Sequence, residues 1–375
     1  MSINRTVKLG EVAHECRQTW SGEQLGTPIV GLEHLIPGEI ELRNWDIDIE
    51  HTFSKKFQKG QILLGRRRVY LRKAVVAPCD GICSGDITVI EATEGIIPEL
   101  LPFIIQNDRF FDYAMQGSAG SLSPRVKWEH LKNYEFPLPT LDEQKILAEK
   151  LWAAYRLKES YKKLLAATDE MVKSQFIEMF GTVKSTKPLT DFIEISFPGE
   201  WGQEDKDGSG VKVIRTTNFT NNGKLDLSDV VTRDIDSVKV EKKKLSKGDI
   251  ILERSGGTNE NPVGRVVYFE EDGVYLFNNF TQLLRCKEGV NSLFIFYSLF
   301  NYYQLNKYVI RSMGNKTTGI QNLKMDRYWQ IPIADVSIER QKEFESIYRQ
   351  ADKSEFELRK SIDAIDAVIK SLINS

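Results

Sequence analysis

The sequence has few cysteines, few histidines and no long apolar run. Four of its 375 residues are cysteine and four are histidine, too few for a disulfide scaffold in a chain of this size. The longest apolar runs, such as residues 292–300, are far shorter than the roughly 18 to 20 residues that a membrane span needs. Residues 1–10 lack the basic start and apolar stretch of a signal peptide. We therefore expect a cytoplasmic protein.

A metal site is also not expected from the sequence. Cys79 and Cys83 are spaced like half of a zinc site, but no second pair of Cys or His lies within easy reach. Structural zinc sites need four such ligands, so we expect reduced structural thiols and no metal. The four histidines are scattered without an obvious carboxylate, Ser or Cys partner: His14, His34, His51 and His130.

Charge of one sign is not in excess. The chain has 51 Lys and Arg against 53 Asp and Glu, a formal net charge of -2, so there is no global positive field to hold a polyanion. With 41% hydrophobic and 28% charged residues, the chain can bury a sizeable core, and its length predicts two globular domains with additions. Disorder as the main state is excluded.

The clearest feature that is present is an internal repeat. Residues 59–64, Lys-Gly-Gln-Ile-Leu-Leu, return as residues 247–252, Lys-Gly-Asp-Ile-Ile-Leu. The offset drifts from about 180 to 197 while the order of the matches holds. Two diverged copies of one unit explain this pattern better than chance does. Further matched pairs are 38–40 with 223–225, and 141–145 with 338–342.

Each copy combines short strands with one long helix. The body of each copy has short Val, Ile and Leu-rich stretches broken by Gly, Asn, Asp and Pro. A stretch without Gly or Pro follows, at residues 141–180 and 338–372, and each predicts a helix roughly 50 to 60 Å long. We expect an α/β fold with two similar domains, 1–140 and 182–337. The central helix is expected at 141–181 and the C-terminal helix at 338–375.

Apolar residues repeat along both predicted helices at intervals of three and four. The charges in each helix nearly cancel, which favours pairing of the two helices as an antiparallel coiled coil. The two domains would then stand at opposite ends of a rigid spacer, related by an approximate twofold axis. Packing of each helix on its own domain is the alternative. The predicted interface residues are Leu157, Tyr161, Leu164 and Met171 in the first helix, and Phe344, Ile347, Leu358, Ile362, Ile365 and Ile369 in the second, with Ser354 as a polar interface position.

Positive charge is gathered locally in spite of the neutral total. Residues 51–79 contain eight Lys or Arg residues and no acid, with Tyr70 among them. If this segment continues as a strand, Arg66 and Arg68 share one face, where Arg can grip phosphates or read guanine. Pairing of this run with the acidic residues 46–50 on a solvated surface is the alternative.

The second copy has two further candidate segments. Residues 289–325 are free of acid and include several Lys, Arg and Tyr residues. The loop 253–261 is rich in hydrogen-bonding groups, and Asn278 and Asn279 add amides that can pair with adenine. Ser-Gly-Gly loops are also ordinary turns. No motif for phosphate binding, dinucleotide binding, metalloprotease, hydrolase, base methylation or nuclease activity is present, so we expect no catalysis by this chain.

At this point the sequence resembles the specificity (S) subunit of type I restriction-modification systems. The resemblance rests on the repeat and on the Pro-containing turns, at residues 136–140 and 331–333, that precede helices opening with an acidic residue and Gln. Segments 70–73 and 81–84 of the first copy are similar to parts of the family's target recognition domains, and so are segments 247–250, 254–257, 264–266 and 278–280 of the second. The second turn departs from the pattern, because Pro332 to Gln341 is two residues longer than Pro137 to Gln144 and lacks the second Pro.

The resemblance implies that each domain reads one half of a split double-stranded DNA target and that the helices fix the gap. It implies two methyltransferase (M) subunits, which bind S-adenosylmethionine, and two restriction (R) subunits, which use ATP and Mg²⁺; this chain would hold no cofactor. The predicted DNA-binding residues are Arg66, Arg67, Arg68, Tyr70, Arg72, Lys73, Ser84 and Arg125 in the first copy, and Arg215, Arg254, Ser255, Thr258, Asn259, Arg265, Asn278, Asn279 and Lys316 in the second.

Three other functions stay open at this point. The chain could serve a related system in which methylation and cleavage share one polypeptide, or act as a two-headed adaptor that binds proteins through its coiled coil. An enzyme with a dispersed active site is the third alternative.

Overall fold

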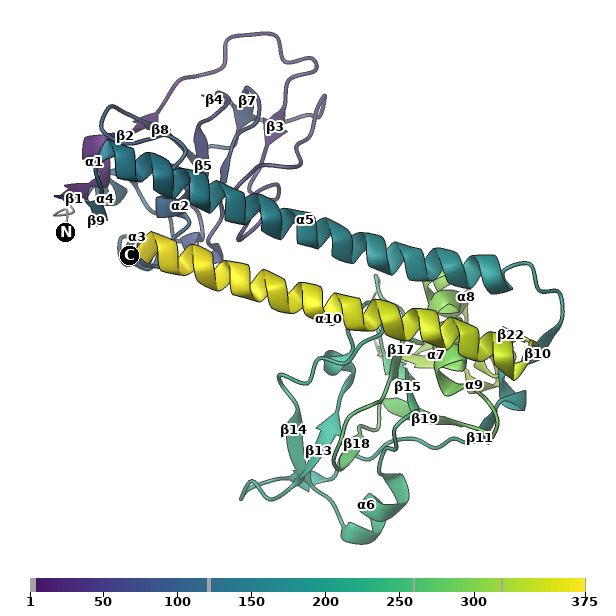
Figure 1. Ribbon diagram of the computed structural model, residues 1–375. Helices are drawn as coiled ribbons and strands as arrows, with labels where there is room; N and C mark the ends of the chain where they lie inside the picture. Colours follow the sequence, from purple (N-terminus) through teal and green to yellow (C-terminus); the bar gives the residue numbers. More distant parts are fainter. Residues whose placement is uncertain (1–4, 120–122, 259, 318–319, 375) are drawn as a thin grey trace. The chain divides into compact units, whose positions relative to one another are not determined.

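The computed structural model describes residues 5–119, 123–258, 260–317 and 320–374, and they form two compact units. Unit 1 comprises Met1–Leu164 with Leu358–Ser375, and unit 2 comprises Leu165–Glu357. Each unit thus contains one body of short strands and helices together with a part of both long helices (Figure 1). In the described residues, no helix has the length and apolar character needed to cross a membrane.

The two long helices are confirmed. Helix α5 spans Leu141–Phe180 and α10 spans Ile338–Asn374, about 60 and 55 Å at 1.5 Å per residue. The N-terminus of α5 is capped by Glu143, which accepts hydrogen bonds from the Thr140 amide at 3.0 Å and hydroxyl at 2.8 Å. The repeated Gln ties each helix to its body. Gln144 accepts from the Ile97 amide at 2.8 Å, and Gln341 accepts from the Asn291 amide at 3.2 Å.

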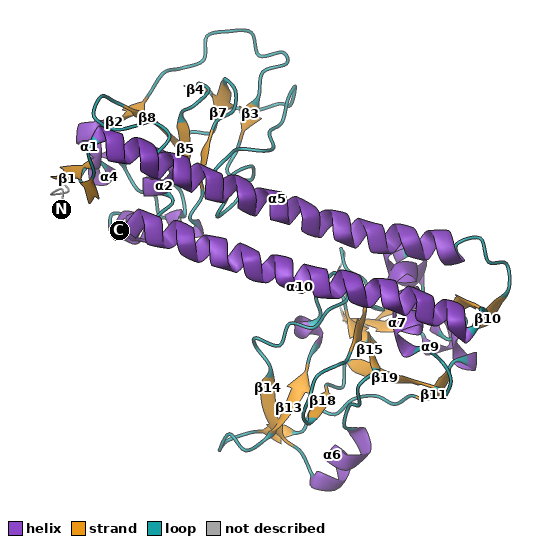
Figure 2. Cartoon of the chain, viewed as in Figure 1, coloured by secondary structure: helices purple, strands orange, loops and turns teal. Residues whose placement is uncertain are grey.

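Unit 1 is built on a four-stranded sheet of order β2-β8-β5-β6. Its short strands are drawn in orange in Figure 2. A three-stranded sheet of order β3-β7-β4 and the pair β1-β9 complete the strands of this unit. The strands are β1 Arg5–Lys8, β2 Ala13–Cys16, β3 Ile29–Val30, β4 Lys55–Phe57, β5 Ile62–Gly65, β6 Ala74–Val76, β7 Gly81–Cys83, β8 Ile87–Ala92 and β9 Glu135–Leu138. The short helices are α1 Leu9–Val12, η1 Val69–Leu71, α2 Leu101–Ile105, α3 Asp108–Gln116 and α4 Trp128–Leu131.

Unit 2 has sheets of order β11-β19-β15-β17, β12-β14-β13-β18 and β16-β21-β20, and the pair β10-β22. Its strands are β10 Thr186–Pro188, β11 Ile193–Ile195, β12 Gln203–Glu204, β13 Val211–Ile214, β14 Val231–Asp234, β15 Ile250–Glu253, β16 Ser255–Gly256, β17 Val266–Tyr268, β18 Tyr275–Phe277, β19 Thr281–Cys286, β20 Gly314–Thr317, β21 Ile320–Leu323 and β22 Pro332–Ala334. Its short helices are η2 Leu189–Asp191, η3 Thr216–Asn218, α6 Ser237–Lys243, α7 Ser292–Leu305, α8 Lys307–Ser312 and α9 Met325–Tyr328.

The repeat seen in the sequence is present in the topology. The order β2-β8-β5-β6 of unit 1 matches β11-β19-β15-β17 of unit 2, with the repeated segments 59–64 and 247–252 leading into the central strands β5 and β15. Each unit also has one parallel strand pair, β3 with β7 and β13 with β18. Each closes with an antiparallel pair that leads into its long helix, β1 with β9 and β10 with β22. The predicted α/β fold with two similar bodies is confirmed.

The long helices run antiparallel within each unit. In unit 1, residues near the start of α5, such as Leu151 and Tyr155, share a core with Ile369 and Leu372 near the end of α10. In unit 2, Val172 and Phe176 near the end of α5 share a core with Phe344 and Ala351 near the start of α10. The start of one helix therefore lies beside the end of the other, as predicted.

The predicted interface of α5 is wrong in register. Leu157, Leu164 and Met171 are 45%, 50% and 46% exposed, while Tyr161 is half-buried. The buried positions of α5 include Leu151, Tyr155 and Glu159 in unit 1, and Val172, Phe176 and Phe180 in unit 2. The polar residues Glu159 and Lys162 belong to this packed face because they form ion pairs with a loop of the body of unit 1. The apolar pattern of the sequence alone favoured the neighbouring stripe of Leu157, Leu164 and Met171 as the packed face.

The predicted interface of α10 is close to the observed one. Phe344 is buried, and the other predicted residues are half-buried: Ile347, Leu358, Ile362, Ile365 and Ile369. The polar position is Glu355, which is buried, and Ser354 is exposed. The buried carboxylate is tolerated because Lys224 lies 2.8 Å from it.

Candidate nucleic-acid interface

The first basic segment, residues 66–73, follows the central strand β5 of unit 1. The extended backbone continues to Arg67, which bridges to Arg125. Arg68 and Arg72 then adopt left-handed backbone conformations, with φ of 52° and 53°, on either side of the turn η1. The prediction that Arg66 and Arg68 share one face of a strand is therefore wrong, because the chain leaves the strand between them.

Several cations of this segment are paired with acids from other parts of unit 1. Arg125 contacts Asp86 at 2.7 Å and Arg67 contacts the same carboxylate at 3.4 Å. Hydrogen bonding to Arg125, together with the charges of both guanidinium groups, holds the pKa of Asp86 below its usual value. Arg72 pairs with Asp108, and with Asp112 at 2.9 Å. These side chains hold the segment in place.

The other side chains of the segment differ in exposure and in their partners. Tyr70 is 51% exposed, and Arg68 is exposed without a side-chain partner among the described residues of the chain. The Nε atom of Arg66 is buried and makes no hydrogen bond within that described part. Lys73 donates to the Leu32 carbonyl at 2.7 Å. The side chains of this segment that are both exposed and without a side-chain partner in the described chain are therefore those of Arg68 and Tyr70. Arg66 lies close to them in sequence.

Ser84 lies near the Asp86 ion pairs. Its hydroxyl accepts a hydrogen bond from the Asp86 amide at 3.2 Å, so it helps to fix the carboxylate that Arg67 and Arg125 share. Three predicted DNA contacts of unit 1, Ser84, Arg67 and Arg125, thus meet at one acid that lies outside the acid-free window. A segment that contains no acidic residue can therefore still lie beside an acidic residue from another part of the chain.

The corresponding loop of unit 2 begins with Arg254. Its backbone amide donates to the Phe280 carbonyl at 2.9 Å, and its side chain is half-exposed with no partner in the described part of unit 2. Ser255 donates to Asn322 at 2.7 Å. The exposed Thr258 accepts from the Asn261 amide at 3.0 Å. Two predicted contacts, Asn259 and the side chain of Lys316, lie outside the described residues.

Arg265 and Arg215 are engaged inside unit 2. Arg265 contacts the buried Glu253 at 2.7 Å, and its guanidinium also donates to the carbonyls of Phe219 and Thr216, both at 3.2 Å. Arg215 contacts Asp229 at 3.0 Å. These bonds tie the central strand β15 to the turn η3, and they leave the two guanidinium groups less free to contact a base than Arg254 is.

The two predicted asparagines differ in accessibility. Asn279 is exposed, whereas Asn278 is buried and its side-chain oxygen has no hydrogen-bond partner in the described part of unit 2. The Asn278 carbonyl accepts from the Thr281 amide at 3.0 Å and hydroxyl at 2.8 Å. Asn279 is thus the amide of the two that solvent can reach.

Ion pairs fasten the body of each unit to a long helix. In unit 1, Glu39 accepts from Lys162 at 2.7 Å and from the Tyr155 hydroxyl at 3.2 Å, and Arg43 pairs with Glu39 at 3.0 Å and with Glu159. Burial works to raise the pKa of Glu39, but Lys162 and Arg43 outweigh it and hold that pKa below its usual value.

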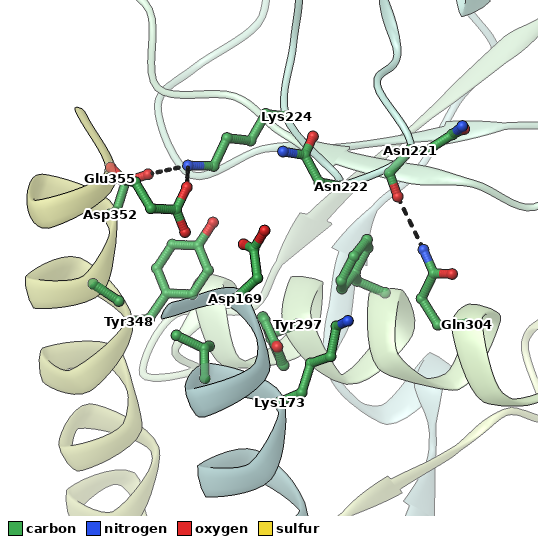
Figure 3. A pocket seen from close by; sticks show the side chains of 13 residues that line it. Asp169, Lys173, Asn221, Asn222, Lys224, Tyr297, Gln304, Tyr348, Asp352 and Glu355 are labelled. Carbon is green, nitrogen blue, oxygen red and sulfur yellow. Dashed lines mark hydrogen bonds and ion pairs between the residues drawn. The ribbon is translucent and has the colours of Figure 1, made fainter. Parts of the chain in front are cut away.

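The junction of unit 2 surrounds a small cavity of about 170 Å³ (Figure 3). The Lys224 ammonium points at two carboxylates of α10, Asp352 at 2.6 Å and Glu355 at 2.8 Å. Burial raises the pKa of Glu355, the nearby Asp169 adds to the rise, and Lys224 opposes it. In unit 2, the body contributes a cation, Lys224, to its contact with the long helix. In unit 1, the body contributes both a cation, Arg43, and a carboxylate, Glu39.

Helix α5 carries a stripe of exposed residues with a seven-residue period. The residues between its larger members are small, so the stripe has the spacing of a coiled-coil seam. We call this set the α5 stripe. Its members, all exposed, are Ala153, Leu157, Ser160, Leu164, Ala167, Met171 and Ser174.

The histidines are less isolated than the sequence indicated. His34 lies 3.4 Å from Asp46, and the His14 ring lies 3.7 Å from the Cys16 sulfur and 3.8 Å from Glu91. The expectation that no histidine has a carboxylate or Cys partner is therefore wrong. Strand pairing brings Glu91 to His14 across 77 residues of sequence, a distance over which a motif search has no signal.

Comparison with known proteins confirms the resemblance seen in the sequence. Residues 183–365 match the family described as type I restriction modification DNA specificity domain. The type I restriction enzyme EcoDI specificity subunit of Escherichia coli is 27% identical over 129 residues, which are 33% of this chain and 29% of that subunit. The chain thus matches less than a third of the length of this curated relative.

Two solved structures share the fold. The S subunit of a type I restriction-modification system from M. genitalium aligns with a TM-score of 0.60 and 12% identity, over 99% of this chain and 95% of that chain. A chain from a structure of type I R-M complex assembly and conformational transition aligns with a TM-score of 0.56 and 15% identity, over 98% and 96%. The likeness to these structures concerns the fold.

Proposed function

We propose that this chain, which has the fold of type I S subunits and a type I DNA specificity domain at residues 183–365, is the DNA-recognition subunit of a type I restriction-modification complex. Each body would read one half of a bipartite target, and the long helices would set the gap. The observation that carries the proposal is the repeated topology: the specificity domain matches the second half of the chain, and the strand order of unit 1 repeats that of unit 2.

The predicted DNA-binding residues of the two bodies would have two roles. Some would contact the DNA directly, and others would hold the contacting loops in place. The exposed Arg68, Tyr70 and Asn279 and the half-exposed Arg254 would be available to base edges and phosphates. Internally paired groups such as Arg72 and Arg265 would hold the reading loops in place. A wrong base pair would cost about 1 to 3 kcal/mol at each position. Two moderate readings become one strong reading because binding of the first half-site raises the effective concentration at the second.

The helices would act as a ruler. Deleting four residues of α5 within 157–171 would remove about 6 Å of helix, roughly two base pairs of DNA at 3.4 Å each. We expect the gap between the half-sites to change or specific binding to be lost. An unchanged gap in the deleted protein would contradict the ruler.

Partner subunits would supply the chemistry. We infer two M subunits, which bind S-adenosylmethionine and methylate adenine, and two R subunits, which use ATP and Mg²⁺; no catalytic residue is assigned to this chain. The α5 stripe is the surface proposed for a helix of the M subunit, because its exposed residues have the spacing of a coiled-coil seam. Leu157→Asp should weaken copurification of M, and Ile177→Asp, another exposed apolar position of α5, is the matched control.

The decisive experiment is to express the chain with its neighbouring methyltransferase and to map methylated adenines by long-read sequencing. A split motif with a fixed gap is the expected result. Methylation without a split motif, or no DNA footprint in the presence of the methyltransferase, would overturn the proposal. Exchanging residues 182–337 for those of a relative should change only one half of the motif.

A further inference from the structure

Three metal-ligating side chains meet on one face of the sheet in unit 1. The Cys16 sulfur lies 3.7 Å from His14 Nε2 and 3.3 Å from Glu91 Oε2, and the latter two atoms are 3.8 Å apart. The group belongs to strands β2 and β8 (Figure 1). None of these residues belongs to the proposed DNA-reading surface or to the helix junctions.

The sheet itself brings the three residues together. His14 lies directly opposite Glu91 in the antiparallel pairing of β2 and β8, so their side chains share a face. Cys16 follows His14 by two residues and therefore lies on the same face. Gln61, next to β5, donates to the Cys16 sulfur at 3.3 Å and to Glu91 at 3.0 Å. The Gln58 amide orients Gln61 by donating to its oxygen at 2.8 Å.

We propose that His14, Cys16 and Glu91 bind a divalent transition-metal cation of the zinc class. A thiolate, an imidazole and a carboxylate are the ligand types that zinc prefers. With bonds of about 2.0 to 2.3 Å and tetrahedral angles, ligand atoms of one ion are roughly 3.3 to 3.6 Å apart. The observed separations of 3.3, 3.7 and 3.8 Å approach that triangle, so only shifts of a few tenths of an ångström are needed.

The surroundings suit a cation that enters from solvent. Cys16 is buried, whereas the side chains of His14 and Glu91 are 54% and 49% exposed, so water can complete a fourth position. Glu15, between His14 and Cys16 and so on the opposite face of β2, is paired with Arg17 at 2.8 Å and with Lys55 at 3.7 Å, and it adds little net charge. Without an ion the Cys16 thiol donates to Glu91. An ion would replace this shared proton and join β2 to β8.

A second group in unit 1 provides an internal contrast. Glu33, His34 and Asp46 also lie close together, but this group has no thiol. The His34 Nδ1 accepts from the Gly31 amide at 2.9 Å, and its Nε2 faces Asp46 at 3.4 Å. Both ring nitrogens are therefore occupied. His34 is a suitable control for His14, and Cys79, which is half-buried without a His partner in the described part of the chain, is a control for Cys16.

The experiment is a cobalt titration of the full chain after treatment with a chelator, followed by zinc competition. We expect one ion per chain and a thiolate-to-cobalt charge-transfer absorption that zinc removes. Cys16→Ser should abolish this absorption. His14→Gln and Glu91→Gln should each weaken binding at least tenfold, since even residues that only hydrogen-bond to a metal ligand contribute about that much to affinity. Cys79→Ser and His34→Gln should bind as the unaltered chain does.

Several outcomes would overturn the site. They are an absorption that persists in Cys16→Ser, an absorption lost in Cys79→Ser, and the absence of stoichiometric binding at micromolar cobalt or zinc. If Cys16→Ser fails to fold, the metal affinities of His14→Gln and Glu91→Gln test the site instead. Both side chains are half-exposed, so replacing them leaves the core intact. Unchanged affinity in both would exclude the site.

Discussion

Units 1 and 2 use opposite charges at the same position of the repeat to fasten a body to a long helix. Glu39 of the segment 38–40 and Lys224 of the segment 223–225 are equivalent in the repeat. Glu39 meets Lys162 and the Tyr155 hydroxyl of α5, whereas Lys224 meets Asp352 and Glu355 of α10. The comparison shows that the fold fixes the position of the contact between body and helix. The charge of the residue at that position can be negative or positive, provided that the helix residues facing it carry the opposite charge.

The apolar packing beside the two junctions differs as well. In unit 2, Phe176 packs against Phe344 and Tyr297, with ring centroids 5.0 Å apart in both pairs. In unit 1, Trp152 packs edge-on against Phe103 at 5.3 Å and against Tyr155 at 5.7 Å. Phe344 stands three residues after Gln341, where unit 1 has Leu147 after Gln144. Unit 2 thus relies more on buried aromatic area at this point than unit 1 does.

The largest effect is expected from removing that aromatic area. Phe344→Ala should lower the free energy of unfolding by about 4 kcal/mol, because Phe344 is fully buried in an aromatic cluster. The equivalent Leu147→Ala should cost only about 1 to 2 kcal/mol, since Leu147 is partly exposed. Denaturant unfolding measures both. Equal losses would show that the two apolar junctions are not different in strength.

A smaller effect is expected at the ion pairs. Lys224→Met should cost about 2 kcal/mol, because it leaves the buried Glu355 without its cation. Lys162→Met should cost less, about 1 kcal/mol, since Arg43 still pairs with Glu39. The double variant Lys224→Met with Glu355→Gln should recover part of the loss. No recovery would contradict the assignment of Glu355 as the stranded charge.

The two junctions should respond to pH in opposite directions. The pKa of Glu39 is lowered from 4.5, so its stabilisation is present above pH 4.5 and is lost as pH falls below it. The pKa of Glu355 is raised from 4.5, so its contribution is present below pH 4.5 and is lost as pH rises. Each pKa unit corresponds to about 1.4 kcal/mol.

Hydrogen exchange can test this opposition unit by unit. Glu39→Gln should flatten the acid dependence of amide protection in unit 1, and Glu355→Gln should raise protection in unit 2 at neutral pH. The same pH response in both units would break the comparison.

The smallest effect on stability, with a clear effect on DNA binding, is expected at the basic segment of unit 1. Arg68→Ala should change the free energy of unfolding by less than about 0.5 kcal/mol, because Arg68 is exposed and without a partner in the described chain. If Arg68 contacts phosphate, the slope of affinity against salt should fall by about 0.9. Arg254→Ala is the matched change in unit 2.

Arg72→Ala sharpens this prediction. It removes an Arg that is paired with Asp108 and Asp112, so it should disturb the turn η1 and lower affinity through the shape of the loop. Gel-shift titrations across salt concentrations distinguish the two variants. An unchanged salt slope in Arg68→Ala and Arg254→Ala together would place the DNA contacts elsewhere.

The sequence by itself determined the repeat, the α/β fold and the two long helices. These features are local: the segments 59–64 and 247–252 are similar as written, and the stretches without Gly or Pro correspond to α5 and α10. The interface of α10 was also predictable, because buried Phe344 and half-buried Ile362 and Ile369 repeat at helical intervals.

Only the tertiary structure decided which groups meet. The stripe of Leu157, Leu164 and Met171 looked like the packed face of α5, but Glu159 and Lys162 take that place because the body of unit 1 supplies their partners. Asp86 and Asp108 neutralise part of an acid-free window from outside it. Strand pairing likewise joins His14 to Glu91. The apolar pattern of a sequence shows which side chains are apolar, whereas contacts between distant segments decide which charges are paired and which remain exposed.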